Sequence, residues 1–265
     1  MDEYKIDMRY RQMFYKKNPI FIKYIRDFLN VDNGMRCRAL LLESKKSDGS
    51  IKGDIKIKGK DISTYFSYKD GTQKEYKYPL TNKIDGYCLN AITIYFFKCI
   101  FNNNVTRSNS IDDITDNIIG VTSVFDIDAP EENGKKIDIL SDRKYTDKII
   151  KGIERIDKEL KLLGIGYKIQ FSGNGYYIIL DDYYDDYNSL ITYCDKFIRL
   201  SYDMSQLTGM DIDAWNLNYY RFFKVPYSFH RDYNRISIPL PYDFSHEYVV
   251  KYSNPDNYVK GKMII

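Results

Sequence analysis

Hydrophobic residues recur at alternating spacings of four and three between residues 149 and 163. The set consists of Ile149, Ile153, Ile156, Leu160 and Leu163. This spacing places all five side chains on one face of an amphipathic helix, which Gly164 is predicted to end. The same reasoning predicts a second helix through residues 190–204 that ends at Gly209. The pair Asn18-Pro19 predicts the start of a third helix, because proline suits the first helical turn.

Short hydrophobic or alternating segments predict β-strands between and around these helices. They lie at residues 36–42, 54–58, 87–101, 124–128, 167–171, 178–180 and 236–238. Residues 102–117 are rich in Asn, Ser and Asp, which is typical of a boundary between lobes. We therefore expect an α+β fold with mixed or antiparallel sheets and flanking helices. An N-terminal α/β lobe at 1–117 is expected to pack on a C-terminal lobe at 118–265.

The order of elements after residue 118 is strand, helix, strand, Gly-rich turn, strand, helix and further strands. This order resembles the β-α-β-β-α-β layout of RRM-like and ferredoxin-like sheets, a layout that fixes no function by itself. Residues 131–144 are polar and are interpreted as a loop. A Gly-containing hairpin is predicted around residues 48–53.

Two carboxylates lie one residue apart at the end of the strand at 124–128. Side chains alternate along a strand, so Asp126 and Asp128 point the same way while Ile127 packs behind them. Pro130 cannot donate to a sheet and is predicted to end the strand beside the pair. Two close carboxylates repel each other unless a cation lies between them, and Mg²⁺ prefers such oxygen ligands. A solvent-facing strand with two incidental aspartates is the alternative.

Composition narrows the class of protein without naming it. The chain has 265 residues and a net charge of only +3, so a nucleic-acid groove would need a local arrangement of cations. Its four cysteines are scattered, no Cys-x-x-Cys pair occurs and only two histidines are present, so no zinc is expected. The scattered cysteines and the lack of a signal peptide favour a cytoplasmic protein. No hydrophobic run reaches the length of a membrane helix, so no membrane partner is expected.

Three further elements could converge on the acidic pair. The first is a turn with two glycines, Ser172-Gly173-Asn174-Gly175, whose backbone amides could approach an anion; an ordinary hairpin is the alternative. The second is Asp211, with Asp213 two residues on, where an exposed strand start is the alternative. The third is the pair Lys224 and His230, which share one face of an extended segment. An isolated His230 would instead be interpreted as a hydrogen-bonded surface histidine.

Taken together and in this order, these motifs resemble the archaeo-eukaryotic primase superfamily. The first motif of that family is an Asp-x-Asp pair, here Phe125-Asp126-Ile127-Asp128. The second resembles Ser-Gly-x-Gly-x-His, here Ser172-Gly173-Asn174-Gly175-Tyr176-Tyr177. The third is a hydrophobic residue and Asp, followed by a Lys-x-Pro-x-Ser-x-His segment. Here it reads Met210-Asp211 and then Lys224-Val225-Pro226-Tyr227-Ser228-Phe229-His230. The likeness is clear over residues 120–265 and faint before them.

The resemblance implies a primase or primase-polymerase with its active site between the two lobes, the second of them RRM-like. Asp126, Asp128 and Asp211 would hold two divalent ions, Mg²⁺ or Mn²⁺, with Asp213 as the substitute for Asp211. The implied nucleotide-binding residues are Ser172, Gly173, Asn174, Gly175, Tyr177, Lys224 and His230. Arg38 and Arg221 are candidate template or nucleotide contacts. The implied partners are a single-stranded DNA template, a primer strand, NTP or dNTP, and an accessory subunit or domain.

Two positions depart from the family pattern. Tyr177 stands where the family has a histidine, and Asn174 stands where an arginine is often found. Both changes remove a potential cation from the phosphate site, although the Tyr177 hydroxyl can still donate a hydrogen bond. A metal-dependent nuclease and a non-catalytic RRM-like nucleic-acid-binding module are the alternative functions. The nuclease would not need Lys224 and His230 placed for a triphosphate, and the binding module would need stacking aromatic residues on its sheet.

Overall fold

The structure is a computed structural model that describes residues 7–31, 36–45, 51–57, 63–66, 93–102, 118–180, 187–213 and 221–260. Its helices are α1 (Met8–Lys17), α2 (Pro19–Leu29), α5 (Arg143–Leu162), α6 (Tyr187–Thr208), α7 (His246–Ser253) and α8 (Asp256–Val259). Its larger strands are β2 (Arg36–Lys45), β3 (Ile51–Ile57), β5 (Thr93–Asn102), β7 (Val124–Asp128), β10 (Tyr167–Phe171) and β11 (Gly175–Leu180). Its shorter strands are β1 (Asn30–Val31), β4 (Ser63–Phe66), β6 (Ile118–Val121), β8 (Glu131–Glu132), β9 (Lys135–Lys136), β12 (Phe222–Lys224) and β13 (Ile238–Leu240).

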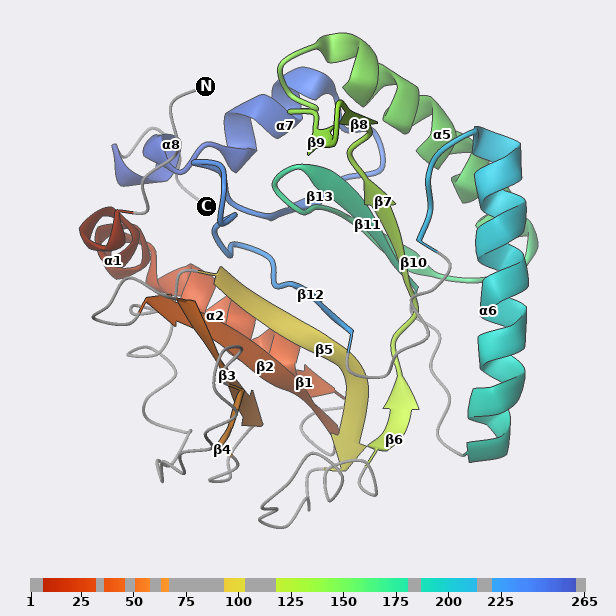
Figure 1. The fold of residues 1–265 in the computed structure, drawn as a ribbon, viewed down its shortest axis with the longest axis horizontal. Helices are drawn as coiled ribbons and strands as arrows, with labels where there is room; N and C mark the ends of the chain where they lie inside the picture. Colours follow the sequence, from red (N-terminus) through yellow and green to blue (C-terminus); the bar gives the residue numbers. More distant parts are fainter. Residues whose placement is uncertain are drawn as a thin grey trace.

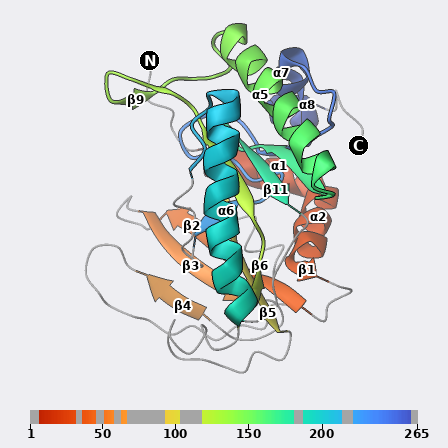
Figure 2. The same cartoon turned by 90° about the vertical axis from the view of Figure 1, so that its right-hand side faces the viewer.

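Two antiparallel sheets face each other in this α+β fold. The first has the order β12-β5-β2-β3-β4, with β1 paired to β2 and β6 paired to β5; the second has the order β13-β10-β11-β7. Helices α5 and α6 lie side by side on the face of the second sheet that is turned away from β12 (Figures 1 and 2). The α+β class and the antiparallel sheets predicted from the hydrophobic pattern are confirmed.

The chain crosses between the two sheets more than once. Strands β6 and β12 both follow residue 117, and both pair with β5 of the first sheet. Between them, Ile212 forms a bridge with Ile127 at the free edge of β7. The division at 117/118 therefore stays a prediction, and residues 103–117 lie outside the described residues. The strand expected at 87–101 is described only from residue 93.

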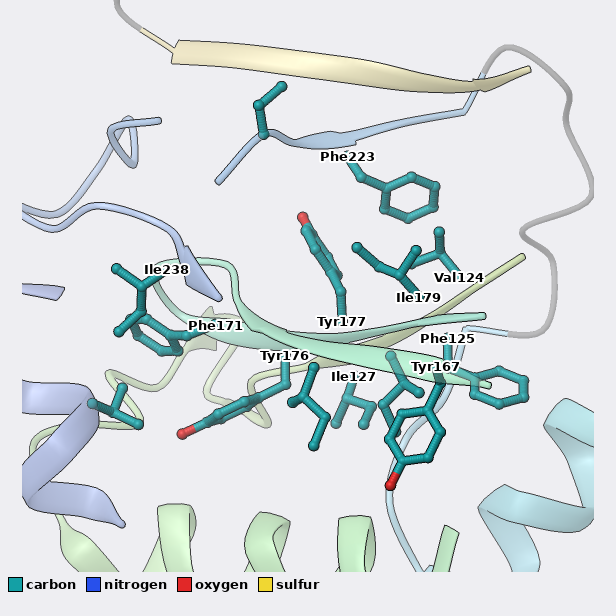
Figure 3. Packing of buried hydrophobic residues seen from close by; sticks show 14 of the residues in the cluster. Val124, Phe125, Ile127, Tyr167, Phe171, Tyr176, Tyr177, Ile179, Phe223 and Ile238 are labelled. Atoms are coloured by element: carbon teal, nitrogen blue, oxygen red, sulfur yellow. The ribbon is translucent and has the colours of Figure 1, made fainter. Parts of the chain in front are cut away.

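The hydrophobic stripe of α5 packs on the second sheet as its spacing predicts. Ile149, Ile153, Ile156 and Leu160 are buried, and Gly164 adopts a left-handed φ of 68° just past the helix. Leu163 is the exception, because it forms the C-cap and is 58% exposed. On the strand side, Phe125 and Ile127 point toward the helices (Figure 3). Alternation then turns Asp126 and Asp128 toward the first sheet.

The segment interpreted as a polar loop at 131–144 contains a small hairpin. Glu131 pairs with Lys136 and Glu132 with Lys135, around a two-residue turn. Asn133 and Gly134 have positive φ values of 54° and 74°, which define the type I′ turn that Asn-Gly favours. This hairpin extends from the end of β7 and places Lys136 beside Asp128.

Buried polar and aromatic contacts join the two sheets. The Gln170 amide on β10 donates hydrogen bonds of 2.7 Å to the Lys224 carbonyl and 2.7 Å to the Ser237 hydroxyl. Phe223 on β12 makes an edge-to-face contact with Tyr177 on β11, at 5.2 Å between ring centroids. These contacts fix β12 across from β10 and β11. Of the helices described, none combines the length and the apolar character needed to cross a membrane.

Candidate active site

A cavity of about 780 Å³ opens between the two sheets. Eight of the residues singled out in the sequence line it: Asp126, Asp128, Ser172, Asn174, Tyr177, Arg221, Lys224 and His230. The other lining residues are Tyr95, Lys135, Lys136, Phe222, Arg231, Asp232 and Tyr233. The cavity thus combines carboxylates from β7 with cations from β9, β12 and the segment after it.

Asp126 carries its carboxylate into the wall of this cavity. It is only 9% exposed, and both this burial and the neighbouring Asp128 raise the pKa of Asp126 to about 7. Two cations offset the negative charge. The Arg221 guanidinium lies 3.6 Å from Asp126 Oδ2, and Lys136 Nζ lies 2.7 Å from Asp128 Oδ1. Nearby positive charge therefore stabilises the ionised forms of Asp126 and Asp128.

The third carboxylate beside this pair is that of Asp213. Its backbone N–H donates to the Asp126 carbonyl at 3.0 Å, and its Oδ2 lies 2.9 Å from the same Arg221 group. Asp211 is exposed and lines a separate hollow of about 200 Å³ on the α5 side of β7. The geometry thus favours Asp213, the substitute residue. Within the described ranges, no group of three Asp, Glu, His or Cys side chains is arranged so that it could hold a metal ion.

Lys224 supplies a buried amine on the opposite wall. Burial lowers the pKa of Lys224, while Asp126 and Asp128 act in the other direction. Among the residues that the structure describes, no carboxylate lies within 4.0 Å of its Nζ, which is 5.8 Å from the centre of the Tyr95 ring. The amine is therefore placed to receive an anion that enters the cavity.

His230 presents one defined nitrogen to its surroundings. Its Nδ1 accepts a hydrogen bond of 3.0 Å from the backbone N–H of Asp232. Burial, followed by the charge of Lys224 and nearby arginines, lowers the pKa of His230 to about 2. The ring is therefore neutral at physiological pH, and because Nδ1 accepts, the proton resides on Nε2. His230 is a neutral hydrogen-bond donor here.

The turn between β10 and β11 packs directly against this histidine. A Cβ atom at Gly173 would lie 2.6 Å from His230 Cδ2, and Gly173 has a φ of 107°, so only glycine suits this position. Behind the turn, Arg235 makes two contacts of 2.7 Å with the Asp138 carboxylate. The turn is thus held from both sides, and Ser172 closes it by donating its backbone N–H to the Gly175 carbonyl at 2.8 Å.

Asn174 is occupied by the protein itself. Its Oδ1 accepts from the Ile139 N–H at 3.0 Å, and its Nδ2 donates to the Ile137 carbonyl at 2.9 Å. These bonds attach the segment after the β8–β9 hairpin to the turn. A role in positioning Lys136 and the hairpin fits these contacts better than a direct phosphate contact.

Tyr177 lies on the cavity side of β11. It is the register partner of Asp126, and Figure 3 shows it pointing toward Phe223 while Tyr176 points to the helices. Tyr177 is 5% exposed, and burial followed by the charge of Asp126 raises the pKa of its hydroxyl. The side chain thus stays neutral. Its role as a phosphate donor remains a prediction.

Sequence reasoning missed the lysines of the hairpin and the residues after His230. Asn133-Gly134 was the available signal for the hairpin, whereas Tyr95 and Arg231 lack a distinctive motif. Arg221 contacts the carboxylates of Asp126 and Asp213, and its role as a template or nucleotide contact stays a prediction. Arg38 lies on β2, and its side chain is not among those described.

Comparisons with known proteins relate the chain to polymerases at the level of fold. No family model and no curated protein matches the sequence. Among solved structures, the chain is similar to the polymerase domain of Mycobacterium tuberculosis Ligase D in complex with DNA. The likeness has a TM-score of 0.61 at 10% identity and covers 97% of this chain and 88% of that one. The fold is therefore of a polymerase-domain type.

Replacing Asn174 by Ala should lower the free energy of unfolding by about 1–3 kcal/mol, because it leaves the Ile139 N–H and the Ile137 carbonyl without their partner. Urea unfolding measures the change. Gln206→Ala, which removes an exposed amide on α6, should change it by less than about 0.5 kcal/mol. Unchanged stability with weakened nucleotide binding would instead make Asn174 a direct contact.

The His230 ring should stay neutral, with its proton on Nε2, from about pH 8 to pH 5, since its pKa in the folded state is about 2. NMR of the ring nitrogens can test this, and His246→Asn assigns the signals because the chain has only two histidines. As pH falls below about 6.5, the unfolded chain binds a proton that the folded chain does not. The raised pKa of Asp126 has the opposite effect on stability, so the contribution of His230 is obtained by comparison: as pH decreases below about 6.5, the wild-type protein should lose stability relative to His230→Gln. A ring that titrates near pH 6.5 would contradict this account.

Proposed function

We propose that this protein is a template-directed nucleotidyltransferase of the primase-polymerase type. It would join nucleoside triphosphates into a strand paired with single-stranded DNA. One observation carries the proposal: the cavity opposes carboxylates on β7 with the amine of Lys224, which has no carboxylate partner among the described residues, and with a neutral imidazole donor. The polymerase-domain fold supports the same reading, and the DNA in the related structure suggests the partner.

One wall of the cavity carries cations that can bind a triphosphate, and the other carries carboxylates that would bind metal ions. Lys224 can neutralise charge on a triphosphate, and His230 Nε2–H can donate to one of its oxygens. Ser172 and the turn around Gly173 lie beside His230 and can contribute further donors. The cavity volume falls in the range of about 300–1,000 Å³ that is typical of small-ligand sites. A nucleotide can therefore lie between the cations and the carboxylates.

Asp126, Asp128 and Asp213 are the residues that would hold Mg²⁺ or Mn²⁺, and because they do not form a metal site as they stand, their carboxylates would have to rearrange around the ions. Both ions prefer carboxylate oxygens, and the burial of Asp126 beside Asp128 calls for compensating positive charge. When bound, such ions would lower the pKa of an attacking 3′-hydroxyl and neutralise charge on the leaving pyrophosphate. Arg221 and Lys136 hold the same carboxylates in the protein alone, so they limit repulsion within the set.

The alternative functions explain less of this cavity. A nuclease also uses carboxylates, but it would not need Lys224 and His230 placed for a triphosphate. An RRM-like binding module would place exposed aromatic rings on the sheet, whereas Tyr177 is 5% exposed and packs against Phe223. Nucleotide transfer uses both walls of the cavity.

A primer-synthesis assay tests the proposal. The wild-type protein is incubated with unprimed single-stranded DNA, labelled NTP or dNTP, and Mg²⁺ or Mn²⁺, and the products are sized on a gel. Labelled products longer than one nucleotide should form. The double variant Asp126→Ala, Asp128→Ala should lose this activity by a factor of about 100 or more, because it removes the ligands on which charge stabilisation depends.

The matched control replaces two exposed aspartates outside the cavity, Asp203→Ala and Asp243→Ala, and should retain synthesis. Circular dichroism establishes that both double variants are folded. Synthesis that survives the loss of Asp126 and Asp128 would refute the assignment of the site. Shortening of the template without synthesis would identify a nuclease instead.

A further inference from the structure

Helix α5 carries a line of cations on its solvent side. The members are Lys144, Lys148, Lys151, Arg155 and Lys158, and all of them are exposed. Successive members are four or three residues apart, so they follow one face of the helix, as the buried stripe does on the other face. We call these five residues the α5 basic stripe. It extends about 21 Å at roughly 1.5 Å per residue.

The helix keeps most of this charge uncompensated. Two of its four acidic residues pair with cations outside the stripe: Asp147 with Arg143 at 3.3 Å, and Asp157 with Lys161 at 2.8 Å. In the part of the chain that the structure describes, no carboxylate lies within 4.0 Å of the amines of Lys148, Lys151 and Lys158. Three exposed stripe amines therefore have no direct counterion among the described residues.

Helix α5 carries a net positive charge, whereas the chain as a whole is close to neutral. With seven basic and four acidic residues, the 20 residues of α5 carry a net charge of +3. The whole protein of 265 residues also has a net charge of +3. The charges outside α5 therefore sum to zero, so α5 carries a local excess within a nearly neutral protein; the shorter helix α1, with four basic and no acidic residues, carries another. A local cluster of this kind is what phosphate binding by a nearly neutral protein requires.

The stripe also begins beside the candidate active site. Lys148 lines the small hollow at the edge of β7, and Asp128 lines both this hollow and the large cavity. Figure 1 shows α5 running from the β8–β9 hairpin along the outer side of the second sheet. A strand that leaves the cavity past Asp128 would therefore meet Lys148 first and could continue along the helix.

We propose that the α5 basic stripe binds the phosphate backbone of a nucleic-acid strand outside the cavity. This inference rests on the proposed function, since it gives the template or the product strand a path away from Asp128. The contact is electrostatic and reads no sequence, because ammonium and guanidinium groups address phosphates rather than bases. The stripe adds affinity for the strand and leaves the chemistry to the cavity.

Fluorescence anisotropy with a labelled single-stranded DNA of mixed sequence tests the stripe. The variant Lys148→Gln, Lys151→Gln, Lys158→Gln removes three charges while keeping good helix formers. Its Kd should rise about tenfold or more at low salt. The slope of log K against log salt should fall in magnitude by about 2, because each phosphate contact on a single strand contributes roughly 0.7.

The control variant replaces three exposed lysines elsewhere, Lys16→Gln, Lys23→Gln and Lys260→Gln. This control makes the same change in net charge at other positions. If the position of the charges on α5 determines binding, the salt slope of the control should stay nearly unchanged. An equal effect in both triple variants, or no effect in the stripe variant, overturns the inference. Stripe-dependent binding to vesicles containing phosphatidylserine, without binding to DNA, would overturn it in favour of a membrane surface.

The same proteins separate this inference from the proposed function. If the wild-type protein synthesises product and the stripe variant binds DNA as tightly as the wild type, the inference about the stripe is refuted and the proposed function is not. Stripe-dependent DNA binding by a wild-type protein that synthesises no product would refute the proposed function and leave the stripe standing.

Discussion

The burial of Asp126 beside Asp128 is the constraint on which the site depends. Strand alternation forces the two carboxylates onto one face of β7, and the facing sheet removes most of the water from Asp126. The charge must then be met from elsewhere in the chain. Arg221 and Lys136 do this by direct contact, and Lys224 contributes from across the cavity. These three cations are therefore placed with reference to one acidic strand.

The geometry of the opposite wall depends on a segment that belongs to both sheets. Strand β12 pairs with β5 of the first sheet. Before it in the chain, Ile212 bridges to Ile127 on β7, and after it comes β13, which pairs with β10; both β7 and β10 belong to the second sheet. Gln170 secures the Lys224 carbonyl, and the glycine at 173 gives the His230 ring its place. The cations and the carboxylates are thus presented by elements that pack on one another, so the site is organised before a ligand arrives.

Elements with a regular spacing of hydrophobic residues could be predicted from the sequence, whereas elements determined by tertiary contacts could not. The stripe of α5 and the shared face of Asp126 and Asp128 follow from local spacing alone. The choice between Asp211 and Asp213 does not, because it depends on the bridge between Ile212 and Ile127, which lie far apart in the chain. The bonds of Asn174 to residues 137 and 139 could likewise not be predicted, since they leave no mark in its own motif. For the hairpin at 131–136, the only signal in the sequence was the turn dipeptide Asn133-Gly134.

The most direct test of the account is the affinity for Mn²⁺, measured by electron paramagnetic resonance on matched variants of the two candidate aspartates. The geometry places Asp213 beside Asp126 and leaves Asp211 exposed outside the cavity. Asp213→Asn should therefore weaken Mn²⁺ binding by about tenfold or more, while Asp211→Asn should change it by less than about threefold. Loss of binding in Asp211→Asn with retention in Asp213→Asn would contradict the arrangement of the site.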